Sequence, residues 1–195
     1  MNNFETPFSA TPIEADDMEG LKLKHISMRG ELDRWEHENI SEAMNWLVHR
    51  RKKDILTEEF IKKLHQKMFG KVWKWAGKFR RSDKNIGVAW HNISMELRIL
   101  LDDVKCWIEH KTYSQDEIAV RFHHRLVWMH LFPNGNGRHA RLMTDILLKE
   151  LFHREPFTWN KGSIDAVSET RKLYIQALKH ADQNDYTYLL SFVRL

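Results

Sequence analysis

The sequence is poor in the residues that build disulfide-rich, turn-rich or membrane-spanning proteins. Its single cysteine, Cys106, excludes an internal disulfide framework. Eight glycines and four prolines in 195 residues are few for a turn-rich β fold and favour helices. No uninterrupted apolar run is long enough to cross a bilayer, and residues 1–7 lack the basic flank and apolar run of a secretory signal. We therefore expect a helical, cytoplasmic protein with no membrane partner.

The charge balance is only mildly basic. Thirty-one Lys and Arg against 27 Asp and Glu give a net charge of +4. The one clear basic run, residues 49–53, lies at the expected end of a helix, where cations complement the helix dipole. We therefore expect no sequence-specific nucleic-acid partner. The length suits one domain, and we predict an N-terminal arm at residues 1–30 followed by a single helical domain at residues 31–195.

Apolar residues recur at helical spacing through most of the chain and predict an all-α fold. Residues 71–93 differ, because aromatic residues alternate there with polar ones around a turn at 82–85. This pattern predicts a short β-hairpin, with an ordinary surface loop as the alternative. The expected helices are residues 31–50 (one or two helices, with a break near Asn39), 58–70 after a Thr57 cap, 94–108 after a Ser94 cap, 115–130 after a Ser114 capping box, one after residue 137, 163–181 and 186–193.

Residues 130–141 carry the chain's most informative motif. They read His-Leu-Phe-Pro-Asn-Gly-Asn-Gly-Arg-His-Ala-Arg, between two expected helices. The glycines allow the backbone to approach a ligand closely, and the amides at a helix N-terminus attract phosphate. The two arginines, three residues apart, share a helical face and can each grip phosphate oxygens. The stretch predicts an anion site with His130 beside it as a candidate base.

This stretch resembles the motif of the Fic family, His-x-Phe-x-(Asp/Glu)-Gly-Asn-Gly-Arg-x-x-Arg. The fixed positions match except for the acid, which is Asn134 here. The resemblance continues through residues 75–80, 83–88 and 174–182, and it looks close to the small bacterial proteins called mobile mystery protein B. It implies an all-α, Fic-type helical bundle with a small β-hairpin flap.

The resemblance implies a protein adenylyltransferase that moves AMP from ATP to a Tyr, Thr or Ser hydroxyl of a target protein. His130 would take the hydroxyl proton, and Arg138 would stabilise the leaving pyrophosphate. Gly137 stands where phosphorylating relatives generally have Lys, which favours AMP transfer. The residues implied to bind the phosphates are Asn134, Gly135, Asn136, Gly137, Arg138 and Arg141.

Asn134 occupies the place of the usual acidic Mg²⁺ ligand of Fic motifs. An amide oxygen can coordinate Mg²⁺ but brings no negative charge. We therefore expect Mg²⁺ to be held weakly or mainly by the phosphates of ATP, and transfer to be slow. The clustered histidines lack the spacing of a zinc site, so we expect none.

Two further segments take roles from the resemblance. The flap would hold an extended piece of the target by main-chain pairing. An inhibitory helix near residues 31–48 would place a glutamate against Arg141, with Glu38 and Glu31 as candidates and a plain exposed surface as the alternative. The flap residues are Asp83, Lys84, Asn85, Ile86, Gly87 and Val88.

Three hypotheses for function remain open at this point. The first is a protein adenylyltransferase, as a toxin with an antitoxin partner or as a homo-oligomer. The second is a phosphotransferase or AMP-removing enzyme on the same scaffold, which Asn134 makes credible. The third is a non-enzymatic nucleotide-binding or partner-binding protein, against which His130 counts because phosphate binding alone needs no base.

Overall fold

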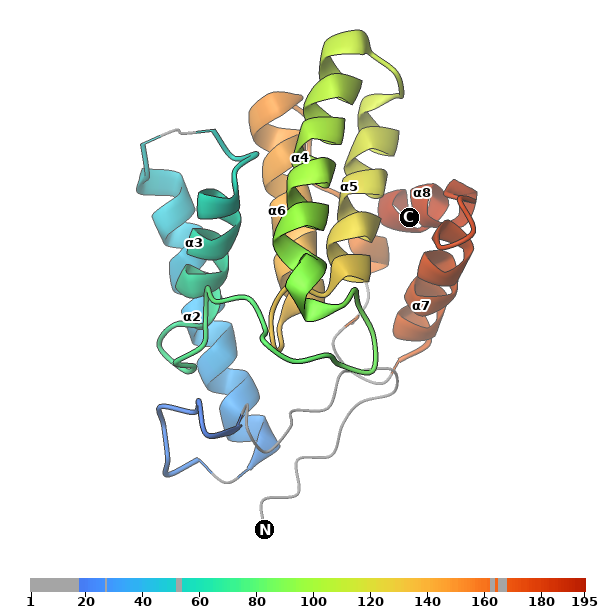
Figure 1. Ribbon diagram of the computed structural model, residues 1–195. Coiled ribbons are helices and arrows are strands. Elements are labelled where there is room, and N and C mark those ends of the chain that lie inside the picture. Colours follow the sequence, from blue (N-terminus) through green and yellow to red (C-terminus); the bar gives the residue numbers. More distant parts are fainter. Residues whose placement is uncertain (1–17, 27, 52–53, 162–163, 165–167) are drawn as a thin grey trace.

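The computed structural model describes residues 18–26, 28–51, 54–161, 164 and 168–195, and helices form most of this part of the chain (Figure 1). The predicted arm therefore lies largely outside the described residues. Within them, no helix has the length and apolarity that crossing a membrane requires. The helices are α2 (Arg29–His49), α3 (Glu58–Phe69), α4 (Ile93–His110), α5 (Gln115–Met129), α6 (Asn136–Leu151), α7 (Glu169–Ala181) and α8 (Thr187–Arg194), with 3₁₀ turns η1 (Trp90–Asn92) and η2 (Trp159–Lys161).

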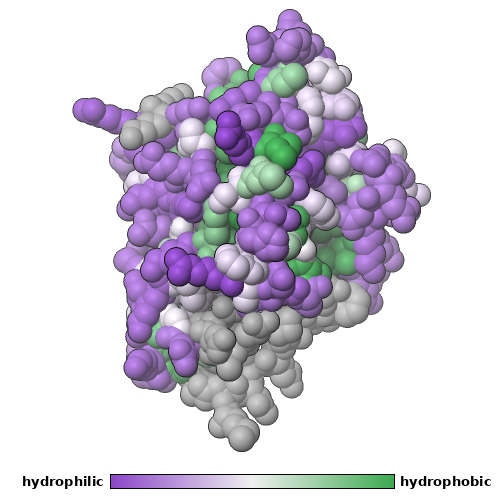
Figure 2. Space-filling model, in the orientation of Figure 1, coloured by the Kyte–Doolittle hydropathy of each residue, from purple (hydrophilic) through white to green (hydrophobic). Residues whose placement is uncertain are grey.

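The helices pack mainly as neighbours in sequence. α5 packs along α6 and α4, α2 pairs with α3 on one side, and α7 pairs with α8 on the other (Figure 1). α3 also contacts α6, which joins the α2–α3 pair to the centre. The face shown in Figure 2 is largely hydrophilic, with apolar groups only in small separate areas. Apolar side chains buried between these layers stabilise the bundle.

Capping side chains explain where several helices begin. Thr57 Oγ1 accepts a hydrogen bond from the Phe60 amide, and Ser114 Oγ accepts one from the Glu117 amide, each at 3.2 Å. Both predicted caps are confirmed. The Ser94 cap is wrong, because α4 already begins at Ile93, where η1 leads directly into it. α7 starts at Glu169, later than predicted.

The predicted break near Asn39 is absent, because α2 runs through that residue. The Asn39 side chain is buried and turned toward α3 rather than toward its own backbone. Its Nδ2 donates to the Lys67 carbonyl and its Oδ1 accepts from the Lys71 amide, both at 2.8 Å. A residue that favours turns in isolation here fastens α2 to the end of α3.

The segment 71–93 is a loop rather than a hairpin, and no strand forms among the described residues. Its backbone pairs with the end of α5 and the residues after it. The Arg80 amide donates to the Leu131 carbonyl at 3.0 Å, and the Val88 amide donates to the Met129 carbonyl at 3.4 Å. Arg80 lies just before the flap (residues 83–88) and Val88 ends it, and no strand ladder forms within the flap. The all-α class is confirmed, but the hairpin predicted within it does not form among the described residues.

Candidate active site

Residues 130–135 of the motif connect α5 to α6, and two of them have a positive φ. His130 follows the last residue of α5 with φ 52° and ψ 63°. Gly135 precedes α6 with φ 78°, and a methyl group placed on it would lie 2.7 Å from the Phe69 ring. Only glycine meets both requirements at position 135 without strain. Gly135 therefore sets where α6 begins.

Side chains beneath the loop fix its backbone. Asn136 Oδ1 accepts from the Phe132 amide at 2.9 Å, and its Nδ2 donates to the Phe132 carbonyl at 2.7 Å. Phe132 is fully buried and stacks on His65, with ring centroids 3.7 Å apart. His65 Nε2 lies 3.1 Å from the Asn134 carbonyl, while its Nδ1 accepts from the Gly77 amide at 3.0 Å. The Asn136 side chain is thus a structural tie, and only its backbone amide is left for a ligand.

The N-terminus of α6 is the anion-binding feature of the loop. No side chain caps it, so its first amides keep their capacity to bind an anion. A methyl group on Gly137 would lie 3.7 Å from Arg141 Nη1, which places this guanidinium along the first turn of the helix. Arg138 lies on the same turn, and its guanidinium carbon is 4.9 Å from the centroid of the Phe69 ring. The residues predicted to bind phosphate therefore lie together at the N-terminus of α6, where both arginines make the helix end cationic.

Glu36 of α2 contacts this cationic end directly. Its Oε2 lies 2.7 Å from Arg138 Nη1, and its Oε1 accepts from Trp73 Nε1 at 2.6 Å. The predicted candidates Glu31 and Glu38 have exposed side chains on the same helix. At about 100° per residue, Glu38 is turned about 200° away from Glu36 around the helix. The structure therefore brings a glutamate of the predicted helix to the loop, but at position 36 and against the first arginine.

His130 is nearly buried at the mouth of the loop, with 5% of its surface exposed. Burial, together with the nearby cations Arg80 and Lys84, lowers the pKa of its imidazole from 6.5 to about 4. The imidazole is uncharged at neutral pH as a result. An uncharged imidazole beside an anion site can accept a proton from a substrate hydroxyl.

The flap lies against the backbone of His130. A methyl group on Gly87, whose φ is 103°, would lie 2.6 Å from His130 Cβ. Arg80, just before the flap, is buried and donates through Nε to the His130 carbonyl at 2.6 Å. The structure thus brings the predicted flap and the candidate base together.

The donor set around Asn134 does not fit a resident metal ion. Asn134 Oδ1 already accepts from the Gly135 amide at 2.7 Å, and its backbone carbonyl contacts His65. No group of three or more His, Cys, Asp or Glu residues converges on one point in the part of the chain that the structure describes. A divalent cation at this loop would therefore have to arrive with the phosphates of its substrate.

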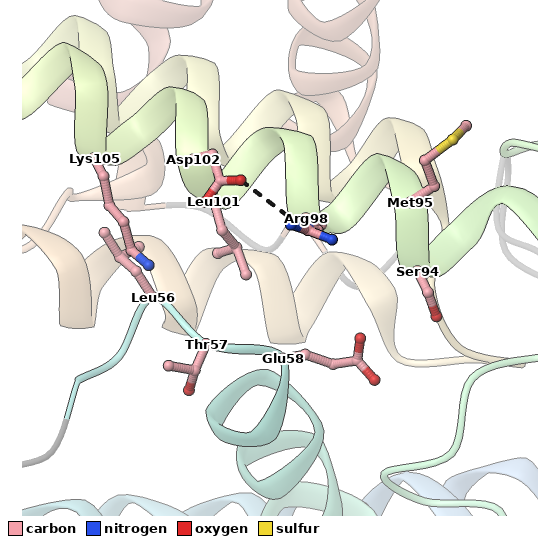
Figure 3. Close-up of a pocket in the computed structure, with 9 residues that line it drawn as sticks. All are labelled: Leu56, Thr57, Glu58, Ser94, Met95, Arg98, Leu101, Asp102 and Lys105. Atoms are coloured by element: carbon pink, nitrogen blue, oxygen red, sulfur yellow. Dashed lines mark ion pairs between the residues drawn. The ribbon is translucent and has the colours of Figure 1, made fainter.

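A hollow of about 570 Å³ lies elsewhere, between the start of α3 and one face of α4 (Figure 3). It shares no residue with the loop or the flap. The Arg98–Asp102 pair at its edge is largely exposed, with nitrogen and oxygen 4.0 Å apart. Its lining residues are Leu56, Thr57, Glu58, Ser94, Met95, Arg98, Leu101, Asp102 and Lys105.

Sequence reasoning missed three residues of the site: Glu36, His65 and Arg80. Glu36 had a detectable signal, because Leu32, Glu36, Asn39 and Ala43 are spaced at i, i+4, i+7 and i+11 and all four are buried. A carboxylate within such a stripe needs a cationic partner. His65 and Arg80 gave no such signal, because their partners are backbone groups that become neighbours only in the fold.

Comparison with known proteins finds a family match for the region that contains the loop and the flap. Residues 55–148 match the Fic/DOC family. A protein adenylyltransferase Fic from Aedes aegypti is 32% identical over 101 residues, which cover 50% of this chain and 20% of that protein. The chain therefore spans about a fifth of the length of that relative.

Solved structures of Fic domains share the fold at low sequence identity. The N-terminal FIC domain of Bep8 from Bartonella sp. 1-1C superposes with a TM-score of 0.69 at 14% identity, covering 89% of each chain. BepC from Bartonella tribocorum, with bound AMPPNP, gives a TM-score of 0.68 at 17% identity and covers 88% of this chain and 89% of that one. The likeness extends well beyond residues 55–148.

Proposed function

We propose that the Fic/DOC family domain formed by residues 55–148 makes this chain a protein adenylyltransferase. One observation carries the proposal: a buried, uncharged imidazole lies at the same short loop as a helix N-terminus with two arginines. The anion site suits the phosphates of a nucleotide, and the imidazole suits a hydroxyl substrate. The relative named as an adenylyltransferase supports this chemistry, and the relative with bound AMPPNP supports nucleotide binding.

The reaction we propose is an in-line displacement at the α-phosphorus of Mg·ATP. The oxygen of a Tyr, Thr or Ser side chain of the target protein forms a bond to the α-phosphorus, and the bond to the pyrophosphate oxygen breaks. His130 accepts the hydroxyl proton. The α6 amides and Arg141 hold the phosphates, and Arg138 stabilises the charge that develops on pyrophosphate.

Glu36 restrains this activity in our proposal. Its ion pair with Arg138 occupies a guanidinium that the leaving pyrophosphate needs. Trp73 Nε1 holds the other carboxylate oxygen, so the glutamate is fixed in the position that opposes nucleotide binding. A restrained transferase agrees with a toxin kept inactive in the cytoplasm, with an antitoxin or a second copy as a partner.

Membership of the mobile mystery protein B subgroup stays a prediction from the sequence.

The test is incubation of the protein with Mg²⁺, a bacterial lysate and ATP labelled on either the α- or the γ-phosphate. We expect protein-bound label from α-labelled ATP only, and its loss in His130→Ala. The control is His37→Ala, which removes an exposed histidine of α2 and should label like the wild type.

The alternatives give different patterns in the same assay. Label from γ-labelled ATP would identify a phosphotransferase. Release of AMP from a previously labelled target, without new labelling, would identify an AMP-removing enzyme. ATP binding without either reaction, in both the wild type and a Glu36→Gly variant, would identify a nucleotide-binding protein without this activity.

A further inference from the structure

Arg80 joins the segment around the flap to the backbone of the candidate base. On one side, its Nη1 donates to the Ser82 carbonyl at 2.9 Å and its Nη2 donates to the Val88 carbonyl. On the other side, its Nε donates to the His130 carbonyl at 2.6 Å and its Nη2 reaches the Met129 carbonyl at 3.3 Å. The side chain thus binds the residue just before the flap, the last residue of the flap and the end of α5 at once.

The chemistry of this contact requires a guanidinium. Arg80 is 3% exposed and meets four carbonyl oxygens that diverge around a planar fork. Its five N–H groups match this arrangement, whereas the ammonium of a lysine donates from a single point. Met129 and His130 are at the C-terminal end of α5, where carbonyls without helical partners favour a cation.

Gly87 makes the close approach possible. Besides its contact with His130, a methyl group at this position would lie 2.8 Å from Arg80 Nη2 and 3.0 Å from the Met129 carbonyl oxygen. The flap, Arg80 and the backbone of His130 are therefore in mutual contact. A change in any one of them displaces the other two.

We propose that Arg80 is a positioning residue, which fixes the distance between the flap and His130 so that a hydroxyl presented by the flap meets the imidazole. The inference rests on the proposed transfer reaction. Arg80 does not touch the substrate in this role, and it acts through the backbone of its neighbours. Its charge has a second effect, since Arg80 and Lys84 both lower the pKa of His130.

The test compares Arg80→Lys, which keeps the charge but loses the fork, with Arg80→Met, which loses both. For Arg80→Lys we expect kcat for AMP transfer to fall at least tenfold and KM for ATP to change less than threefold. The Val88 amide, 3.4 Å from the Met129 carbonyl, should exchange its hydrogen faster in both variants. In Arg80→Met alone, an NMR titration should show the pKa of His130 moving upward, because a cation has been removed.

Two further variants keep the test decisive. Arg81→Met removes the exposed neighbouring arginine and should leave kcat and exchange within twofold of the wild type. Gly87→Ala pushes the flap away from His130 while the Arg80 guanidinium is still present, so it should lower kcat and speed the hydrogen exchange of the Val88 amide. This variant decides the question if Arg80→Met does not fold.

The inference is overturned if Arg80→Lys retains wild-type kcat and flap exchange, or if KM for ATP rises in proportion to the loss, since that would mean a general loosening of the phosphate loop. Failure of the proposed function is separable from failure of this inference. If the wild type transfers no AMP, the exchange of the Val88 amide and the titration of His130 still report whether Arg80 holds the flap.

Discussion

Glu36 and Arg138 are 102 residues apart in sequence and form an ion pair with 2.7 Å between Oε2 and Nη1. The pair is sheltered from water, with 3% of the Glu36 side chain and 17% of the Arg138 side chain exposed. Because Glu36 also accepts from Trp73, its carboxylate has little freedom to turn away. The first arginine of the loop is therefore already engaged by a carboxylate where a phosphate would compete for it.

Replacing Glu36 by glycine should increase nucleotide binding. Removal of the carboxylate leaves Arg138 available to phosphate, and we expect ATP to bind on the order of tenfold more tightly, which corresponds to about 1.4 kcal/mol. AMP transfer to the protein's own hydroxyl groups and to lysate proteins should rise together with the ATP affinity. Isothermal titration with ATP and labelling with α-labelled ATP measure the two effects.

Glu31→Gly and Glu38→Gly are the matched controls for this change. All three positions lie on α2, so each substitution carries a similar helix penalty of about 1 kcal/mol. Only Glu36→Gly should alter ATP affinity, because Glu31 and Glu38 are exposed. Equal gains in all three variants would mean that loosening α2, rather than freeing Arg138, raises activity.

The site shows which parts of a structure a sequence can predict. The loop was predictable, because its histidine, glycines and arginines lie within residues 130–141 and act through local turns and a helix end. The all-α class followed from apolar periodicity in the same way. Thr57 and Ser114 were predictable as caps, since a cap bonds to an amide three residues away.

The predictions that failed concern segments whose hydrogen-bond partners are distant in the sequence. The segment 71–93 looked like a hairpin from its alternating residues, but its Arg80 and Val88 amides donate to the Leu131 and Met129 carbonyls instead of to carbonyls within the segment. Asn39 looked like a helix break, but its amide side chain bonds to the end of α3. In each case hydrogen bonds to a distant segment outweighed the conformation that the local sequence favours.

Gly135 and Gly137 should respond in opposite ways to alanine. Gly135→Ala puts a methyl group 2.7 Å from the Phe69 ring at a φ of 78°, and we expect a loss of about 2 kcal/mol or more in the free energy of unfolding. Gly137→Ala serves as the control, since its methyl group makes ordinary contact at 3.7 Å within a helix, where alanine is favoured by up to about 1 kcal/mol. Urea unfolding measures both, and a stable Gly135→Ala variant would contradict this account of the turn.

Asn134→Asp should lower the Mg²⁺ concentration that the reaction requires. The substitution replaces a neutral amide by a carboxylate beside the phosphate site, and Mg²⁺ prefers such anionic oxygens. The carboxylate can still accept from the Gly135 amide as Asn134 Oδ1 does. We expect half-maximal AMP transfer at a Mg²⁺ concentration several-fold lower than for the wild type. An unchanged Mg²⁺ titration would mean that the ATP phosphates alone set the metal requirement.

Buried histidines should make the fold sensitive to acid. Burial lowers the pKa of His123 to about 3 and those of His130 and His139 to about 4, and it holds the pKa of His65 well below 6.5. An unfolded histidine takes up its proton near pH 6.5, so between about pH 6.5 and pH 4 the unfolded chain binds more protons. Stability should therefore fall as the pH falls through this range, by up to about 1.4 kcal/mol per pH unit for each histidine. Asp145, whose pKa burial raises to about 6, acts in the opposite sense as a single group.

Urea unfolding at pH 7, 5.5 and 4.5 measures this slope, and a pair of variants assigns it. His123→Gln removes one buried imidazole, while glutamine can still bond to the Tyr174 hydroxyl that His123 Nε2 contacts at 2.8 Å. Its stability should fall less steeply with acid than that of the wild type. His37→Gln replaces an exposed histidine and should leave the slope unchanged. If all three proteins lose stability in parallel, groups other than the buried histidines control the response to acid.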